Sequence, residues 1–292
     1  MCCMEKTMLE IKEIDCKSAL VKSNLPDADY VINPYSGCEM ACSYCYAAFM
    51  CRFMDKPFSS WGNFIYPKIN ILEVLQKQLL SKKLDKTKTI LLSSVTDPYT
   101  FIEKKYELTK SILEILYSSK WQGRIGILSK NPLLTRDINV FQKLQNVEVG
   151  MTITSNNNNY SRILESKAPL VKARLNALAE LNANNIKTYA FIGPIIPQYM
   201  QSIEDLEFLF QELQHIGTFE VYMEFMNLGI MKNNVVSLLN KEIGINQTKN
   251  FVDSLKDKSY IAECSETIRE LLKKYNIKLK LNMVMEHKKL SK

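Results

Sequence analysis

The chain has 292 residues, of which 46% are hydrophobic and 24% are charged; this composition excludes a disordered chain and suits a globular protein with a buried core. The formal net charge of +7 comes mostly from lysine, and it is compatible with an anionic substrate without requiring one. Neither a secretory signal nor an apolar stretch of membrane-spanning length is visible, so we expect a cytoplasmic protein whose eight cysteines stay reduced.

Along the chain, short apolar stretches typical of buried strands alternate with stretches in which apolar residues have helical spacing. The predicted strands are 27–35, 87–94, 123–130, 147–154, 186–193 (ended by Pro194), 218–228 and the alternating segment 277–282. The predicted helices are 109–119, 137–144, 171–185, 202–214 (opened by a capping box of Ser202 and Asp205) and 265–276. The polar run 155–160 is predicted to be a loop.

This alternation with short links indicates a parallel sheet with helices outside it. About six βα units can be counted, fewer than the eight of a closed barrel, so we predict an α/β fold with a partial (β/α)6-type TIM barrel. A doubly wound open sheet stays an alternative. We expect residues 27–228 to form the core, residues 1–26 a short N-terminal extension, and residues 229–292 a C-terminal helix and strand extension that closes one edge of the barrel.

Stretches with unusual chemistry follow the predicted strands. The cysteines follow the first strand, SSVTDPY the second, SKNPL the third, TSNNNN the fourth and GPIIP the fifth. Because the carboxyl ends of parallel strands meet at one edge of a sheet or barrel, we expect these stretches to form a single active face.

The loop after the first strand places Cys38, Cys42 and Cys45 within eight positions. A structural zinc site usually needs four ligands in two separated pairs, and the sequence offers neither a second pair nor a histidine at ligand spacing. An iron–sulfur cube also binds thiolates, normally four, so three cysteines without an evident fourth predict a cluster with one open iron. Cys51 lies on a segment that looks helical, and we expect it to pack rather than bind the cluster.

The sequence CEMACSYC resembles the C-x3-C-x-aromatic-C signature of the radical S-adenosylmethionine (radical SAM) superfamily. The resemblance implies a [4Fe–4S] cluster held by Cys38, Cys42 and Cys45, the catalytic and metal-binding residues, with S-adenosylmethionine bound at the open iron. One electron would cleave this cofactor and release a 5′-deoxyadenosyl radical, which implies a flavodoxin- or ferredoxin-type electron donor. Tyr44 and Tyr46 then pack beside the cluster and the nucleoside, or are core aromatics.

Further motifs resemble, in the same order, the spore photoproduct lyase-like (DNA repair photolyase-like) branch of this superfamily across residues 18–228. They are NPYSGC, SSVTDPYTFIEKKYELT, LSKNPLLTRDI, RILESKAPLVKARLNALAEL and FIGPIIP. The resemblance implies that Thr96, beside Asp97, contacts the methionine part of the cofactor, that Lys130 reaches its carboxylate, and that Thr152 supplies another hydroxyl. Alternatively, Asp97 caps a turn before a proline and Lys130 is a surface lysine.

One departure from this branch concerns the hydrogen donor. Spore photoproduct lyases carry a cysteine that returns a hydrogen atom to the repaired thymine, and the matching position here is Ser94, whose O–H bond is too strong for that step. Cys51 or Cys264 could replace it only by reaching the pocket. We therefore predict a radical SAM enzyme of lyase or transferase type with an unidentified substrate other than the thymine dimer. A DNA lesion lyase or nucleobase-modifying enzyme is one alternative, and a non-catalytic cluster- or metal-binding protein is another.

Overall fold

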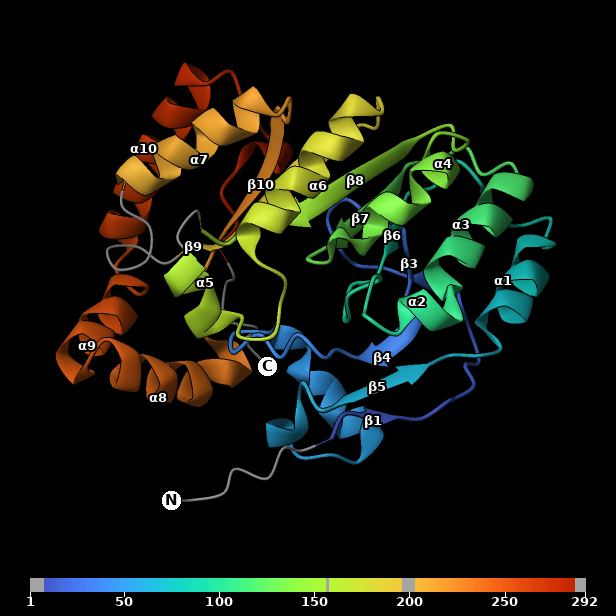
Figure 1. Ribbon diagram of the computed structural model, residues 1–292, viewed down its shortest axis with the longest axis horizontal. Helices are drawn as coiled ribbons and strands as arrows, with labels where there is room; N and C mark the ends of the chain where they lie inside the picture. Colours follow the sequence, from blue (N-terminus) through green and yellow to red (C-terminus); the bar gives the residue numbers. More distant parts are fainter. Residues whose placement is uncertain (1–7, 156–157, 196–202, 287–292) are drawn as a thin grey trace.

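The computed structural model describes residues 8–155, 158–195 and 203–286 (Figure 1). Its strands are β1 (Glu10–Ile11), β2 (Val21–Lys22), β3 (Tyr30–Ile32), β4 (Tyr35–Gly37), β5 (Phe64–Pro67), β6 (Ile90–Leu92), β7 (Ile125–Ser129), β8 (Val147–Thr152), β9 (Thr188–Ile195), β10 (Glu220–Phe225) and β11 (Lys278–Leu279). Its α-helices are α1 (Ile71–Leu79), α2 (Glu103–Tyr106), α3 (Leu108–Ser118), α4 (Ile138–Phe141), α5 (Asn158–Leu164), α6 (Val171–Ala183), α7 (Ile203–His215), α8 (Lys232–Glu242), α9 (Ile245–Ser254) and α10 (Lys258–Lys274). Its 3₁₀-helices are η1 (Tyr46–Met54), η2 (Phe58–Ser60), η3 (Pro132–Asp137), η4 (Gly229–Met231) and η5 (Lys280–Asn282).

The larger of the two sheets has the strand order β11-β10-β9-β8-β7-β6-β3-β2. Within the described residues, the neighbours from β3 to β11 pair in parallel, and β2 pairs antiparallel with β3 at one edge. Figure 1 shows α1, α3, α4 and α6 along the outer side of this arc of strands. The predicted α/β fold with a partial barrel is therefore confirmed, and the parallel strands β3, β6, β7, β8, β9 and β10 lie within or overlap six of the strands that the sequence indicated. No helix in the described ranges is both long and apolar enough to span a membrane.

The outer side of this sheet, which faces the helices, is apolar. Ile32, Leu92, Ile127 and Val149 lie in register on four adjacent strands, and all are completely buried. They form one core with helix residues such as Leu178. Continuous apolar burial of this kind is what parallel strands covered by helices require.

The inner side of the sheet is filled near the amino ends of the strands. Gly150 faces Tyr189, and a Cβ atom at Gly150 would lie only 2.3 Å from the tyrosine ring, so glycine is needed for the ring to cross the interior. Nearer the amino ends, the Glu148 carboxylate accepts hydrogen bonds from Lys187 and, at 3.0 Å, from Lys280. Because these groups close the amino end of the barrel, a ligand would enter from the carboxyl ends of the strands.

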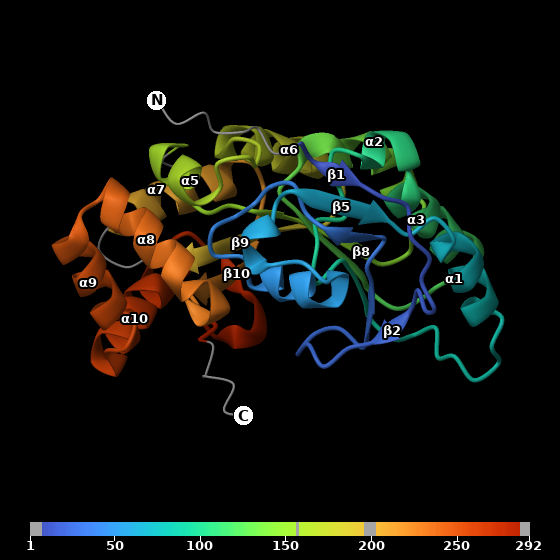
Figure 2. The same cartoon turned by 90° about the horizontal axis from the view of Figure 1, so that it is seen from below.

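A second, smaller sheet has the order β1-β5-β4, with β5 in the middle. In Figure 2 this sheet and η1 lie in front of the larger sheet. Strand β4 ends at Gly37, directly before the first cysteine of the motif, and pairs antiparallel with β5. The loop that carries the cysteines therefore starts from a fixed strand.

The helices α8 and α9 support this loop from the other side. Val235, Leu239 and Phe251 are completely buried and share a second hydrophobic core with Cys51 of η1. The expectation that Cys51 packs is confirmed, with its Sγ 3.8 Å from Ser60 Oγ. The helices α8 and α9 were not predicted from the sequence.

Two predicted loop and strand boundaries are wrong. The strand 186–193 was expected to end before Pro194, but β9 continues to Ile195, which pairs with Phe225 of β10. This end of β9 extends beyond its last pairing with β8, so a proline without an N–H group is tolerated there. The loop expected at 155–160 is wrong for residues 158–160, which begin α5.

Other predicted elements differ in length. The first strand 27–35 is split between β3 and β4, which belong to different sheets. The helix 137–144 is reduced to α4 after η3, and the strand 277–282 is reduced to β11 before η5, where Leu281 has a φ of +63°. Ser202 of the predicted capping box lies outside the described residues. The domain boundaries 1–26, 27–228 and 229–292 stay predictions.

The ion pairs of Glu148 predict how the free energy of unfolding depends on pH. Burial alone would raise the pKa of Glu148, but hydrogen bonds from Lys187 and Lys280 lower it from 4.5 to about 2. A carboxyl group whose pKa is lower in the folded than in the unfolded state stabilises the fold at pH values above its unfolded pKa. This stabilisation is lost as the pH falls from the unfolded pKa to the folded pKa. We expect wild type to exceed Glu148→Gln in free energy of unfolding near pH 7, and this difference to shrink by roughly 3 kcal/mol between about pH 5 and pH 2.

Urea unfolding at a series of pH values measures this difference. The control is Glu266→Gln, which alters an exposed i,i+3 pair with Arg269 and should show no such pH dependence. A Glu148→Gln difference that stays constant with pH would contradict the assigned pKa shift.

Candidate active site

The three cysteines lie on the connection between β4 and η1. Cys38 and Cys42 are buried, and Cys45, directly before η1, is partly buried. The loop leaves β4 through Gly37, whose φ is +86° and whose added Cβ would lie 2.3 Å from the Phe64 carbonyl oxygen. Only glycine fits both constraints, so this position fixes the entry of the loop.

Backbone contacts hold the middle of the loop. The Cys45 N–H donates to the Cys42 carbonyl at 3.1 Å, and the Ser43 N–H donates to the Leu164 carbonyl at 2.9 Å. The second bond joins the cysteine loop to the end of α5, more than a hundred residues later in the chain, and Figure 1 shows the two segments side by side.

Two features of the surroundings act on the ionisation of the three thiols in opposite directions. Burial raises the pKa of all three thiols, that of Cys42 to about 12. The ammonium of Lys130 is the main opposing influence on Cys42 and Cys45, because it lowers the pKa of both. Since thiolates are the form that binds a metal, Lys130 assists ligation by these two cysteines.

The loop carries the type of ligand that an iron–sulfur cluster needs, because it places three thiols close together in the sequence. Within the described residues, no three His, Cys, Asp or Glu side chains converge so that they could hold one ion. Cysteines that bind different irons of a cube need not converge on one point. Two buried polar atoms of the loop, Ser43 Oγ and Glu39 Oε2, have no hydrogen-bond partner among the described residues, as expected where a polar group is normally bound.

Lys130 and Thr152 lie on the inner side of the barrel. Thr152 ends β8 in register with Phe191 of β9, on the face that carries Gly150 two residues earlier. Lys130 directly follows β7, and its Nζ lies 5.7 Å from the centre of the Tyr44 ring. The topology thus brings Lys130, Thr152 and the cysteine loop together at the carboxyl edge of the strands.

Asp97 braces two strand ends through its carboxylate. Oδ1 accepts hydrogen bonds from the Tyr99 N–H at 2.8 Å and the Ser129 hydroxyl at 2.6 Å, and Oδ2 accepts one from the Lys130 N–H at 2.8 Å. Burial raises the pKa of Asp97, and these three bonds oppose the rise. The contacts favour the turn-capping interpretation, extended to the placement of Lys130. A direct contact of Asp97 with the cofactor stays a prediction.

Hydroxyl groups of the other candidate residues also contact the cysteine loop or the loop after β6, which forms the rim at the carboxyl ends of the strands. Thr96 donates to the Gly37 carbonyl at 2.5 Å, directly before the first cysteine. Tyr46 donates to the Ser94 carbonyl, and Tyr44 donates to Glu165. Tyr46 therefore spans from the cysteine loop to the loop after β6, whereas Tyr44 points to α5.

Glu165 and Arg174 were missed by the sequence analysis. Both side chains are completely shielded from solvent, and Glu165 Oε2 lies 2.6 Å from Arg174 Nη2. A signal was present, because Arg174 falls at helical spacing from Val171 and Leu178 on the buried face of α6. A charged residue on an apolar helix face needs a buried partner, which the sequence alone did not identify.

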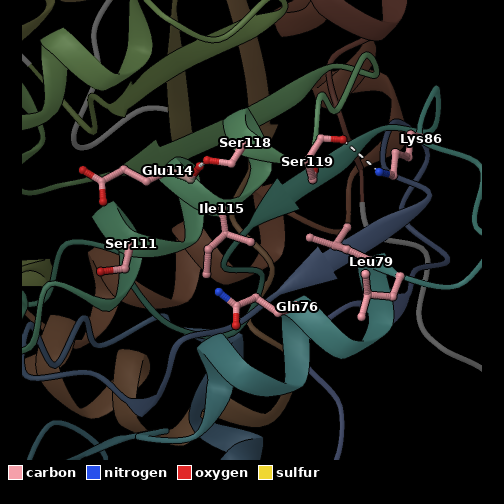
Figure 3. Close-up of a pocket in the computed structure, with 9 residues that line it drawn as sticks. Gln76, Leu79, Lys86, Ser111, Glu114, Ile115, Ser118 and Ser119 are labelled. Carbon is pink, nitrogen blue, oxygen red and sulfur yellow. Dashed lines mark hydrogen bonds between the residues drawn. The ribbon is translucent and has the colours of Figure 1, made fainter.

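A pocket of about 550 Å³ lies elsewhere, between α1 and α3 (Figure 3). Leu79 and Ser118, at the carboxyl ends of these helices, contribute to its lining. Because helices that link parallel strands run opposite to them, these helix ends lie near the amino edge of the sheet. The pocket is therefore separate from the cysteine loop.

Comparison with known proteins identifies related sequences and folds. The family model for the radical SAM superfamily matches residues 32–210. An uncharacterized protein of Methanocaldococcus jannaschii is 36% identical over 220 residues, which cover 75% of this chain and 79% of that protein. A spore photoproduct lyase complexed with dinucleoside spore photoproduct has a similar fold, with a TM-score of 0.70 at 15% identity over 92% of this chain and 81% of that chain. A variant of spore photoproduct lyase with bound AdoMet (S-adenosylmethionine) gives a TM-score of 0.62 at 17% identity over 79% and 66% of the two chains.

The hydrogen bonds of Asp97 predict that replacing this residue destabilises the cofactor-free protein. Asp97→Asn places an amide N–H₂ where the carboxylate accepted hydrogen bonds, so one donor is left facing another. We expect the free energy of unfolding to fall by about 2 kcal/mol, measured by urea unfolding of the cofactor-free protein. The matched control Asp253→Asn, in an exposed pair with Lys256, should change it little. Unchanged stability of Asp97→Asn would show that Asp97 is no brace.

Proposed function

Because the chain belongs to the radical SAM superfamily, we propose that it is an enzyme that reductively cleaves S-adenosylmethionine and abstracts a hydrogen atom from a substrate. Cys38, Cys42 and Cys45 would hold a [4Fe–4S] cluster. When bound, the cluster supplies the electron that cleaves the sulfonium and releases the 5′-deoxyadenosyl radical. The observation that carries this proposal is the position of the cysteine loop beside Lys130, at the edge where the parallel strands end.

The residues around the loop suit the amino-acid end of S-adenosylmethionine. Burial lowers the pKa of Lys130, but negative charge on Cys42, in the thiolate form that binds a cluster, and on Glu165 raises it overall, so Lys130 stays a cation. A lysine cation can bind the cofactor carboxylate. The Thr96 hydroxyl donates its hydrogen to Gly37, so its oxygen can still accept a hydrogen bond from the cofactor amine.

The substrate that we propose differs from the thymine dimer. The position that matches the hydrogen-donating cysteine of spore photoproduct lyases is Ser94, at the rim contacted by Tyr46. Of the two thiols considered as replacements, Cys51 is completely buried beside Ser60, and Cys264 lies on α10, packed against the main core. Because Ser94 stands at the rim and neither Cys51 nor Cys264 reaches it in the described part of the chain, we propose that the product radical has a different fate from the one in that repair reaction.

A nucleic-acid substrate is the second candidate, and a row of aromatic side chains on η1 favours it. The Tyr46 and Phe49 rings stack at a centroid distance of 6.3 Å, and Phe49 contacts Phe53 at 6.1 Å. Tyr46 and Phe53 are exposed, and Arg52 lies over the Phe58 ring nearby. Exposed aromatic rings next to a cation are suited to stacking with nucleobases.

The electron donor is also part of the proposal. Reductive cleavage needs one electron for each cofactor molecule, and a flavodoxin- or ferredoxin-type protein can supply it. A non-catalytic cluster-binding protein, the third interpretation, would bind the cluster without cleaving S-adenosylmethionine.

The enzyme function predicts a cofactor product. Anaerobic reconstitution with iron and sulfide, reduction by dithionite and addition of S-adenosylmethionine should yield 5′-deoxyadenosine, detected by liquid chromatography. Cys42→Ala should lose both bound iron and product, because its thiolate is one of three cluster ligands, whereas Cys264→Ala, which alters a cysteine on the outer helix α10, should keep both. A fully loaded wild type that forms no 5′-deoxyadenosine would support the non-catalytic interpretation instead.

The nucleic-acid candidate predicts a role for Phe53. Phe53→Ala should weaken binding of a fluorescent single-stranded oligonucleotide by about tenfold, because stacking on an aromatic ring contributes roughly 1–3 kcal/mol for each base. Phe208→Ala removes a similarly exposed ring on α7 and is the matched control. Fluorescence anisotropy at fixed salt measures both; equal affinities of wild type and Phe53→Ala would reject this aromatic row as the binding surface.

A further inference from the structure

Glu165 is surrounded by three groups that come from separate parts of the fold. Tyr44 of the cysteine loop donates a hydrogen bond to Oε1, and Arg174 Nη2 lies 2.6 Å from Oε2. Lys130 Nζ lies 3.7 Å from Oε1. One carboxylate thus contacts the loop of the expected cluster ligands, the lysine expected to bind the cofactor, and α6.

Arg174 anchors this arrangement to the barrel. Its Nε and Nη2 donate to the Pro169 carbonyl at 2.9 and 2.8 Å, and its Nη1 donates to the Thr152 carbonyl at 3.0 Å. Since the guanidinium is planar and bonded on several sides, it has one orientation. The Glu165 carboxylate is therefore fixed relative to the end of β8.

The burial of this pair points to a role other than stability. Neither the Glu165 nor the Arg174 side chain has exposed surface. Removing two charges from water costs free energy, and an apolar pair of similar volume is often at least as stable. Tyr44, which is partly buried and stands between Cys42 and Cys45 in the sequence, adds a hydroxyl group to this set of polar side chains. A stabilising core would not need these charges, whereas a site that orders charged groups does.

The charges of Glu165, Lys130 and Arg174 are arranged so that Lys130 can still bind another anion. Glu165 carries one negative charge between the two cations Lys130 and Arg174, so it keeps them close despite their mutual repulsion. Its contact with Lys130, at 3.7 Å, is longer than a hydrogen bond, in contrast to its 2.6 Å contact with Arg174. Lys130 thus keeps hydrogen-bond donors for another carboxylate.

We propose that Glu165, fixed by Arg174, is a positioning residue that sets Lys130 and the Tyr44 part of the cysteine loop in the geometry that binds S-adenosylmethionine. This proposal rests on the proposed function, because it concerns the same cofactor. Glu165 touches neither the substrate nor the reacting atoms in this role; it acts through Lys130 and Tyr44. The link between Ser43 N–H and the Leu164 carbonyl, one residue before Glu165, adds a second connection between α5 and the loop.

The experiment measures binding rather than turnover. Reconstituted wild type, Glu165→Gln, Lys130→Met and the double variant are compared for iron content and for the dissociation constant of S-adenosylmethionine, obtained by equilibrium dialysis. Glu165→Gln should retain its iron, because no cluster ligand is changed, and should bind the cofactor about tenfold more weakly, as is usual when a residue that orients a ligand is altered.

The double variant separates positioning from a general structural effect. If Glu165 acts through Lys130, then Glu165→Gln should weaken binding much less in the Lys130→Met background than in wild type. Equal effects in both backgrounds, or an affinity within about twofold of wild type for Glu165→Gln, would overturn the proposal.

Tyr44→Phe provides a second test if Glu165→Gln does not fold. It removes one hydroxyl, keeps the ring, and should also weaken cofactor binding. Tyr275→Phe is the matched control, since it removes a Tyr–Glu hydrogen bond, to Glu207 at 2.8 Å, between α10 and α7. Tyr44→Phe with the affinity of Tyr275→Phe would overturn the role of the loop contact. Loaded wild type that does not bind S-adenosylmethionine would overturn the proposed function as well, whereas the outcomes above overturn the role of Glu165 alone.

Discussion

The site depends on holding three thiols of one short loop in fixed positions next to a cation. A loop with buried thiols and few internal hydrogen bonds has no stable conformation of its own, so its surroundings must define it. Gly37 fixes the start of the loop, η1 fixes its end, and the carbonyl of Leu164 binds its middle. The core formed with α8 and α9 covers it from outside. Cys38 and Cys42 are themselves members of this second core, so the loop is packed into the interior of the protein.

Charge is arranged in two layers inside the barrel. Near the amino ends of the strands, Glu148 and Glu220 pair with Lys187 and Lys280, and the Tyr189 ring lies above this layer. Near the carboxyl ends, Glu165 stands between Lys130 and Arg174. The first layer is closed by its own ion pairs, whereas the second contains Lys130, whose distance to Glu165 leaves it able to bind a further anion. This difference explains why the same kind of network closes one end of the barrel and forms a candidate binding site at the other.

The sequence predicted the elements whose hydrophobic patterns are long, and the site residues that follow them. The parallel strands and the helices α3, α6 and α7 have such patterns, and parallel topology then places Lys130 and Thr152 beside the cysteines. The strands β1 and β2 have two residues each and cannot show a period, and α8 is rich in polar residues, so these elements depend on tertiary packing for their recognition. Arg174 was visible as a charge on an apolar face, but its pairing with Glu165 exists only after α5 and α6 have packed together.

The contacts of Ser94 separate cofactor binding from the fate of the substrate. Its N–H donates to Asn33 Oδ1 at 2.9 Å, and its carbonyl accepts the Tyr46 hydroxyl. Both bonds are made by the main chain, so they do not depend on which side chain stands at this position. A thiol or a hydroxyl at residue 94 is therefore compatible with the same rim and the same placement of Tyr46. The chemistry that quenches a product radical can thus change at residue 94 while the residues proposed to bind the cluster and the cofactor keep their arrangement.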